Sequence, residues 1–168
     1  MTMRMPPVPK RGTYELRYGI QATDSRSMGQ CYWGTDPSFL HAEGLPLDTR
    51  IGGQIRYTAN GTYPSDIGWE QDTDDDDYNA EVDKKMRNNG FMKGPEYIVA
   101  SAGGRETNRI SATSTRRIIV REPMSPDVTY YLRFKTVQDY TEKQLFVDYL
   151  EWCPKEVYDN PEYPEDIW

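Results

Sequence analysis

The strongest constraint on the fold of this chain is an alternation of apolar and polar residues with a period of two. In the stretch 12–20, the apolar and aromatic residues share one face: Tyr14, Leu16, Tyr18 and Ile20. Glu15 and Arg17 fall on the opposite face. The stretch 129–137 alternates in the same way, with these residues on one face: Tyr130, Leu132 and Phe134. Because successive side chains of a strand point to opposite sides, both stretches are predicted to be half-buried strands.

Further strands are predicted from short apolar or β-branched runs at 1–5, 28–33, 54–57, 117–121 and 145–153. The rest of the region 34–68 is rich in Gly, Pro, Asp and Thr and is predicted to be irregular. The segment 139–143 is expected to join its two flanking strands as an antiparallel hairpin. Many strands with long loops favour a mostly β fold, an antiparallel jelly-roll β-sandwich.

One short helix is predicted near residues 75–89. Tyr78, Val82 and Met86 recur every four residues, which places them on one helical face. The acids at 74–77 stand at the start, where the helix dipole favours negative charge, and the basic residues at 84, 85 and 87 stand in the second half. Asn89 and Gly90 then provide a stop signal.

The length of 168 residues suits one domain. Only 36% of the residues are hydrophobic, but 13 tyrosines and 4 tryptophans supply large rings that can fill a core. We expect a sandwich domain over 1–153 and an acidic, proline-containing tail over 154–168 that runs along the surface. No apolar run approaches the roughly 20 residues that span a bilayer, and no signal peptide is visible. The chain is therefore expected to be part of a longer protein.

The net charge of −7 disfavours nucleic acid and anionic membranes as partners, because both need a basic face. A neutral sugar or a protein partner is compatible with this charge. Cys31 and Cys153 lie in apolar runs and lack metal-ligand spacing. They are predicted to be buried free thiols, with a disulfide between them left open.

No recognisable catalytic set is present. The single histidine, His41, stands in a predicted loop, and there is no nucleophile elbow or phosphate-binding loop. With 27 acidic residues, some pair of carboxylates will always be close, so a glycosidase-like pair carries no information. We therefore expect a protein that is not an enzyme.

A weak calcium-loop pattern occurs at Asp72, Asp74 and Asp76. The sixth position of such a loop should be glycine and the twelfth glutamate, whereas this chain has Asp77 and Asp83 there. The predicted helix already explains the acids, because they stand at its N-terminus. Ca²⁺ remains a possible cofactor and these aspartates remain weak candidates.

Sugar binding needs an aromatic face for the pyranose ring and polar side chains for its hydroxyls. Candidate residues of these two kinds occur in and near the loops: Trp33, Asp36, Tyr63, Asp66, Trp69 and Arg105. Each of the rings could equally pack in the core. Trp152 lies within a predicted strand and is expected to be structural.

Several short sequence motifs together resemble those of a known protein family. The most specific is Asp83-Lys-Lys-Met-Arg-Asn88 followed by Gly90-Phe-Met-Lys-Gly-Pro95; others include Gln30-Cys-Tyr32, Gly68-Trp69 and Tyr130-Tyr-Leu-Arg-Phe-Lys135. The chain resembles, over nearly its whole length, the C-terminal domain of fasciclin-containing surface lipoproteins of Bacteroidetes. These are associated with SusC/SusD-type glycan-uptake systems. The resemblance implies a galactose-binding-like jelly roll, an outer-membrane address and a lipid anchor on a missing N-terminal part, but no ligand residues.

The function expected from these observations is non-catalytic carbohydrate binding at the cell surface, within a polysaccharide-utilisation system. The alternative is a structural domain that docks on a SusC/SusD-like outer-membrane complex and has no sugar site. Neither alternative involves nucleic acid or direct membrane insertion by this domain. Exposed rings at Trp33 and Trp69 would favour the first, and a broad apolar patch without a pocket would favour the second.

Overall fold

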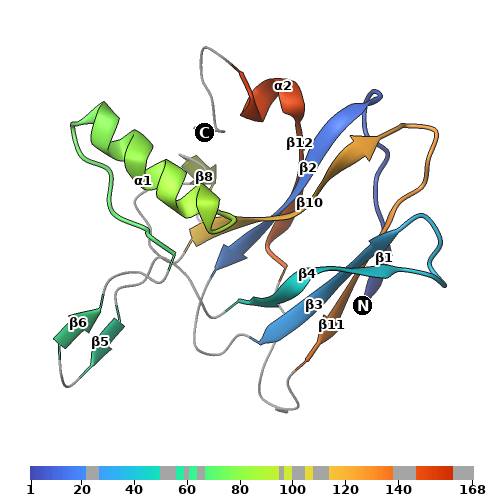
Figure 1. Ribbon diagram of the computed structural model, residues 1–168, viewed down its shortest axis with the longest axis horizontal. Helices are drawn as coiled ribbons and strands as arrows, with labels where there is room; N and C mark the ends of the chain where they lie inside the picture. The colour runs from blue at the N-terminus through green and yellow to red at the C-terminus, as the bar shows by residue number, and fades with distance from the viewer. Residues whose placement is uncertain are drawn as a thin grey trace.

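The computed structural model describes residues 1–21, 27–49, 56–58, 61–63, 67–94, 97–99, 105–107, 114–137 and 147–160. The main body consists of two four-stranded antiparallel sheets that enclose one core, a β-sandwich (Figure 1). The predicted mostly β, antiparallel fold class is therefore confirmed. The jelly-roll connectivity remains a prediction.

Sheet A has the strand order β1-β11-β3-β4, and each neighbouring pair is antiparallel. Its strands are β1 (Thr2–Arg4), β11 (Tyr131–Thr136), β3 (Met28–Gly34) and β4 (His41–Asp48). Strand β4 lies in the region predicted to be irregular, and His41 begins this strand instead of lying in a loop. Gly44, with φ of 55°, and Pro46 interrupt the apolar pattern of β4, and the pairing with β3 shifts register near them.

Sheet B has the order β12-β2-β10-β7 and is also antiparallel. Its strands are β12 (Tyr149–Pro154), β2 (Gly12–Gln21), β10 (Ser114–Met124) and β7 (Phe91–Lys93). The hairpin predicted across 139–143 is wrong, because β11 belongs to sheet A and β12 to sheet B. Each of these two strands pairs instead with strands that lie further away in the sequence.

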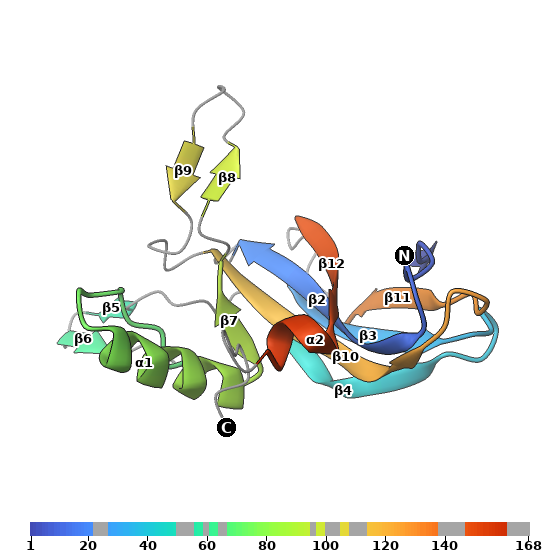
Figure 2. The ribbon, with the colours of Figure 1, turned by 90° about the horizontal axis from the view of Figure 1, so that it is seen from above.

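Two small hairpins lie outside the sheets. They are formed by β5 (Arg56–Thr58) with β6 (Gly61–Tyr63) and by β8 (Tyr97–Val99) with β9 (Arg105–Thr107). Figure 2 shows the β8–β9 hairpin projecting away from the sandwich. The strand predicted at 54–57 is observed at its last two residues, within β5, while 54–55 lie outside the described residues.

The predicted helix is confirmed as α1 (Asp76–Asn88). Asp75 caps its N-terminus by accepting a hydrogen bond from the backbone N–H of Tyr78 at 3.1 Å. Val82 and Met86 are buried, as their spacing predicts, whereas Tyr78 of the same predicted face is 41% exposed. Gly90 follows the helix with φ of 74°, a conformation that glycine adopts without strain.

A second, short helix, α2 (Lys155–Tyr158), opens the segment predicted to be a surface tail. Tyr158 at its end is buried, so the first residues of that segment pack onto the sandwich. Residues 161–168 lie outside the described residues, and the boundary proposed at 153 remains a prediction. Within the described ranges, no helix has the length and apolar composition that crossing a bilayer requires.

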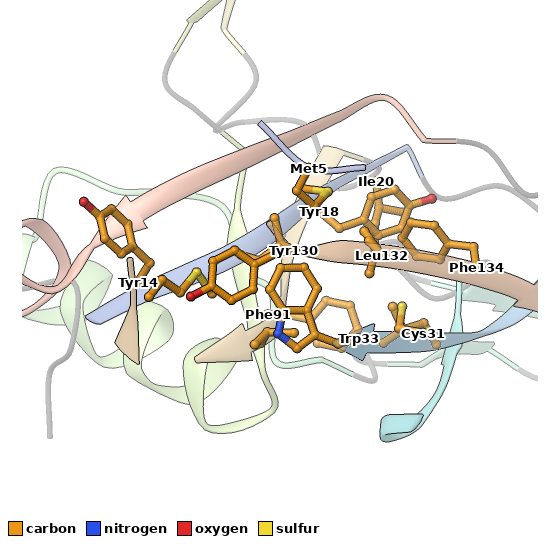
Figure 3. Close-up of a cluster of buried hydrophobic side chains, with 14 of the residues drawn as sticks. Met5, Tyr14, Tyr18, Ile20, Cys31, Trp33, Phe91, Tyr130, Leu132 and Phe134 are labelled. Carbon is orange, nitrogen blue, oxygen red and sulfur yellow. The ribbon is translucent and has the colours of Figure 1, made fainter. Parts of the chain in front are cut away.

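The core lies between the two sheets and is rich in aromatic rings (Figure 3). Trp33 stacks on Tyr130 with ring centroids 5.3 Å apart, and Tyr18 packs against Phe134 at 5.4 Å. Trp152 meets Trp33 edge-on, which confirms its structural role. The four apolar residues predicted to share one face of β2 are all buried in this core: Tyr14, Leu16, Tyr18 and Ile20.

Both cysteines are free and buried, as predicted. Cys31 lies on the inner face of sheet A, and Cys153 lies on β12 at the edge of sheet B. The alternative of a disulfide between them is not realised. Burial raises the pKa of the Cys31 thiol to about 12, so this thiol stays protonated at neutral pH.

The opposite face of β2 is buried as well, so the prediction of a half-buried strand is corrected. Glu15 and Arg17 are 0% and 1% exposed. Glu15 accepts charged hydrogen bonds from Arg17 of its own strand, Arg87 of α1 and Arg121 of β10, at 2.5–2.9 Å. Helix α2 packs against β2 and β12, and α1 reaches this face through Arg87, which alternation along one strand cannot reveal.

Candidate functional site

The first predicted sugar platform, Trp33, is not available to a ligand. Its side chain is 1% exposed, it stacks on Tyr130, and its Nε1 donates to Oε1 of Glu122 at 2.5 Å. The residue pairs with Leu132 across the sheet, and both side chains point to the core. Trp33 is therefore a core residue, and its assignment as a ligand-binding residue is corrected.

The second predicted platform, Trp69, is also a core residue. It is 8% exposed, and the buried Lys93 places its Nζ 5.9 Å from the ring centroid. This ammonium group is in turn paired with Asp72 at 2.5 Å. The face of the indole is therefore occupied by protein, and Trp69 offers no platform either.

The other predicted ligand residues are spread over different parts of the molecule. Asp36 is exposed in the loop between β3 and β4. Tyr63 lies in β6 and Arg105 in β9, but their side chains are outside the described residues, as is the whole of Asp66. Of the predicted set, only Asp36 is described as reaching solvent.

The strand that buries Trp33 turns its neighbour Tyr32 outward. Tyr32 pairs with Arg133 of β11, and two residues further along these strands Gly34 pairs with Tyr131. Because directly paired residues share a side of the sheet, Tyr32, Tyr131 and Arg133 all lie on the outer face of sheet A. Each of the three is half-buried.

Arg133 is held in place at this face by two hydrogen bonds. Its Nε donates to Oγ1 of Thr2 and its Nη2 donates to the carbonyl oxygen of Pro37, both at 2.7 Å. The first bond ties it to strand β1 and the second to the loop between β3 and β4. A guanidinium fixed in this way loses little conformational entropy when it binds a ligand.

The loop between β3 and β4 borders the same face. A Cβ atom at Gly34 would lie 3.2 Å from the Leu40 side chain and 3.3 Å from the Phe39 carbonyl oxygen, so the loop approaches the strand end closely. Asp36 accepts a hydrogen bond from the backbone N–H of Ser38 at 2.8 Å, which stabilises the turn. Phe39 leaves its ring 82% exposed.

The outer face of strands β1, β3 and β11 is locally basic on an acidic protein. Among the described residues of β1, β3 and β11, it carries Arg4, Arg133 and Lys135 and no acid. We refer to this surface as the Arg133 face. Its members are Thr2, Arg4, Tyr32, Tyr131, Arg133 and Lys135, together with Asp36 and Phe39 of the bordering loop.

Two of the three weak calcium candidates take structural positions. Asp72 is paired with Lys93, Asp76 begins α1, and Asp74 is exposed just before the helix. Among the described residues, no group of three His, Cys, Asp or Glu side chains is placed to hold a metal ion. The exposed His41 lies beside Glu43 of the same strand, with its Nε2 2.5 Å from Oε1.

The Arg133 face can stack a ring on its tyrosines and donate hydrogen bonds from a fixed guanidinium, which suits binding. Sequence reasoning missed Tyr131, Arg133 and Phe39, although the alternation in 129–137 already placed Tyr131 and Arg133 opposite the core residues. Comparisons with models of known protein families, with curated proteins and with solved structures found no match for the chain.

Proposed function

We propose that this domain is a non-catalytic binding module that holds a glycan against the Arg133 face. The observation that carries the proposal is the outward placement of Tyr32 and Tyr131 beside a pinned arginine on an outer sheet face. Sugar rings have one apolar C–H face, which tyrosine rings can cover. Tyr32 and Tyr131 take the role of sugar platform that was predicted for Trp33 and Trp69, because the rings of these two tryptophans are buried.

Each group of this face has a defined part in the proposed complex. The rings of Tyr32 and Tyr131 supply apolar area, and Phe39 at the border adds an exposed ring. Arg133 donates to ring or hydroxyl oxygens of the sugar, since it has five N–H donors and uses only two in the hydrogen bonds described above. Asp36 supplies an exposed carboxylate that accepts hydrogen bonds from hydroxyls.

The biological setting of the proposal comes from the sequence resemblance. It is an outer-membrane, cell-surface address, with a lipid anchor on a further N-terminal part and SusC/SusD-like neighbours. In that setting a non-catalytic module would keep a polysaccharide near the uptake machinery. Nothing in this role requires Ca²⁺ or another cofactor.

The proposal is tested by measuring the binding of purified protein to a panel of soluble oligosaccharides and polysaccharides by glycan array and calorimetry. Tyr32→Ala and Tyr131→Ala should each weaken binding at least tenfold, since tenfold is about 1.4 kcal/mol and a stacked ring contributes about that much. Tyr78→Ala is the matched control, because Tyr78 is an exposed tyrosine on α1, outside the Arg133 face.

Two outcomes would reject glycan binding at this face. One is the absence of binding to any glycan in the panel, and the other is binding that Tyr32→Ala and Tyr131→Ala leave unchanged. Circular dichroism spectra of the variants should match that of the wild type, because both residues lie outside the core.

The second candidate function is docking on a protein of an outer-membrane complex. The observation that favours it is the 81% exposure of Leu45 on β4, an edge strand of sheet A. Leu45→Asp should then abolish co-purification with a SusC/SusD-like pair and leave glycan binding intact. Loss of co-purification without any glycan binding would select this function over the first.

A further inference from the structure

An arginine points into the space between the two sheets at one end of the sandwich. Arg117 of β10 pairs with Tyr18 on one side and with Phe91 on the other, and both of these partners belong to the core. Paired residues share a side of the sheet, so the Arg117 side chain is on the inner face. Alternation would place an apolar residue at this position.

The guanidinium of Arg117 is fixed, but its charge is not paired. Its Cζ lies 4.4 Å from the centroid of the Phe91 ring, and its Nη1 donates to the carbonyl oxygen of Asn89 at 2.9 Å. No carboxylate forms an ion pair with it among the described residues. Its Nε is buried and has no hydrogen-bond partner among the residues that the structure describes. Buried donors of this kind are rare and point to a missing acceptor.

The described residues around Arg117 do not supply that acceptor. Burial lowers the pKa of the half-buried Arg117 below its usual range. The buried thiol of Cys31 stays protonated at neutral pH, because its pKa is about 12, so it provides no negative charge.

A cavity of about 140 Å³ lies next to this arginine and is partly open to solvent. Its lining comes from both sheets: Ile20, Pro46, Leu47, Asp48, Phe91 and Arg117. Four of these six residues are apolar. An engineered apolar cavity of roughly 150 Å³ holds benzene, so this cavity can take a ligand of about that size.

We propose that this cavity binds a small organic monocarboxylate, with its carboxylate on the Arg117 guanidinium and its apolar body against Ile20, Leu47 and Phe91. The carboxylate supplies both the counter-charge and the acceptor that Arg117 lacks. The site is separate from the Arg133 face, and the proposal does not depend on glycan binding.

The test uses benzoate as the probe and benzamide as its neutral counterpart, titrated into the full chain and followed by calorimetry and NMR. Benzoate should bind with a Kd of about 1 mM or tighter, and benzamide at least tenfold more weakly. The Nε–H resonance of Arg117 should shift on titration with benzoate. Arg117→Gln should abolish benzoate binding, while Arg133→Gln, an arginine replacement on the other sheet, should leave it unchanged.

The proposal is overturned if benzoate does not bind, or if benzamide binds as well as benzoate. It is also overturned if wild-type binding leaves the Arg117 Nε–H resonance unmoved, a measurement that holds even if Arg117→Gln fails to fold.

Discussion

The outer faces of the two sheets are built on the same alternation, yet one is closed and the other open. On sheet B the polar residues Glu15 and Arg17 are buried, where α2 packs on β2 and Arg87 of α1 reaches Glu15. On sheet A the corresponding polar and aromatic residues, such as Tyr32 and Arg133, reach the surface. Figure 1 shows both helices beside sheet B and none over β1, β3 and β11.

The closed face shows what is needed to bury charge. The carboxylate of Glu15 has three guanidinium partners, and Arg87 and Arg121 also lie over the ring of Tyr158 at 5.6 and 4.8 Å from its centroid. Without such partners a buried charge is strongly unfavourable. On the open face Arg133 is solvated and needs only two hydrogen bonds to hold its position. This comparison indicates that the segments covering a sheet, and not the strand pattern, decide which polar face stays open to a ligand.

The largest effect is expected for Glu15→Gln on the closed face. This substitution leaves Arg17, Arg87 and Arg121 without their shared counter-charge, and breaking a buried pair costs about 3–5 kcal/mol. Urea denaturation should therefore show a loss of that size in the free energy of unfolding. Glu70→Gln is the control, since the Glu70–Lys85 pair is exposed and should change stability by less than about 1 kcal/mol. Equal small effects would mean that the Glu15 cluster does not stabilise the fold as a buried charge network.

The next largest effect is expected for Tyr158→Ala, which removes the ring that covers the closed face. Tyr158 is buried and stacks with two arginines, so its removal should cost about 3 kcal/mol. Val157→Ala, at its exposed neighbour in α2, should cost less than about 1 kcal/mol. Both values come from urea denaturation. A similar small loss for both variants would show that α2 does not act as a cover.

The sequence predicted the strands and the inner faces well because both depend on local periodicity. The alternation in β2 and β11 identified the core residues, and the spacing and caps of α1 identified the helix. Strand β4 was missed because Gly44 and Pro46 break its pattern. The pairing of β11 and β12 was mispredicted because proximity in sequence says nothing about which sheet a strand joins.

The candidate site was predicted only in part, for a physical reason that Trp33 and Tyr32 illustrate. Tyr32 and Trp33 are adjacent in the sequence, and from the sequence alone either ring could be the exposed one. Only the register with Leu132 and Arg133 settles that Trp33 faces the core and Tyr32 the surface. The inward position of Arg117 could not be predicted either, because it results from a register shift in β10 between Ile118 and Val120.

A third effect should appear as a pH dependence of stability that originates on the inner side of sheet A. The pKa of Cys31 is raised by burial from its usual 9.0 to about 12, so the folded protein keeps a proton that the unfolded chain loses. The contribution of Cys31 to stability should therefore be constant below pH 9 and should fall by about 1.4 kcal/mol per pH unit between pH 9 and 12.

Urea denaturation at several pH values in this window checks the prediction, with Cys31→Ala as the comparison. The variant should show a shallower decline than the wild type. Burial also raises the pKa of Tyr149, to about 12, and this contributes the same decline to both proteins. If the free energy of unfolding fell with pH at the same rate in wild type and variant, the inner side of sheet A would be accessible to water.

The smallest effect on stability is expected for Arg133→Gln, at the centre of the open face. Its two hydrogen bonds lie at the surface, so water can replace them and the free energy of unfolding should change by less than about 1 kcal/mol. Arg17→Gln, the matched change on the closed face, should cost several times more, because it breaks a buried ion pair with Glu15. Glycan affinity should respond in the opposite order, with at least a tenfold loss for Arg133→Gln and none for a folded Arg17→Gln. A large stability loss at Arg133 would indicate that this arginine is a structural element and that the open face is not a binding surface.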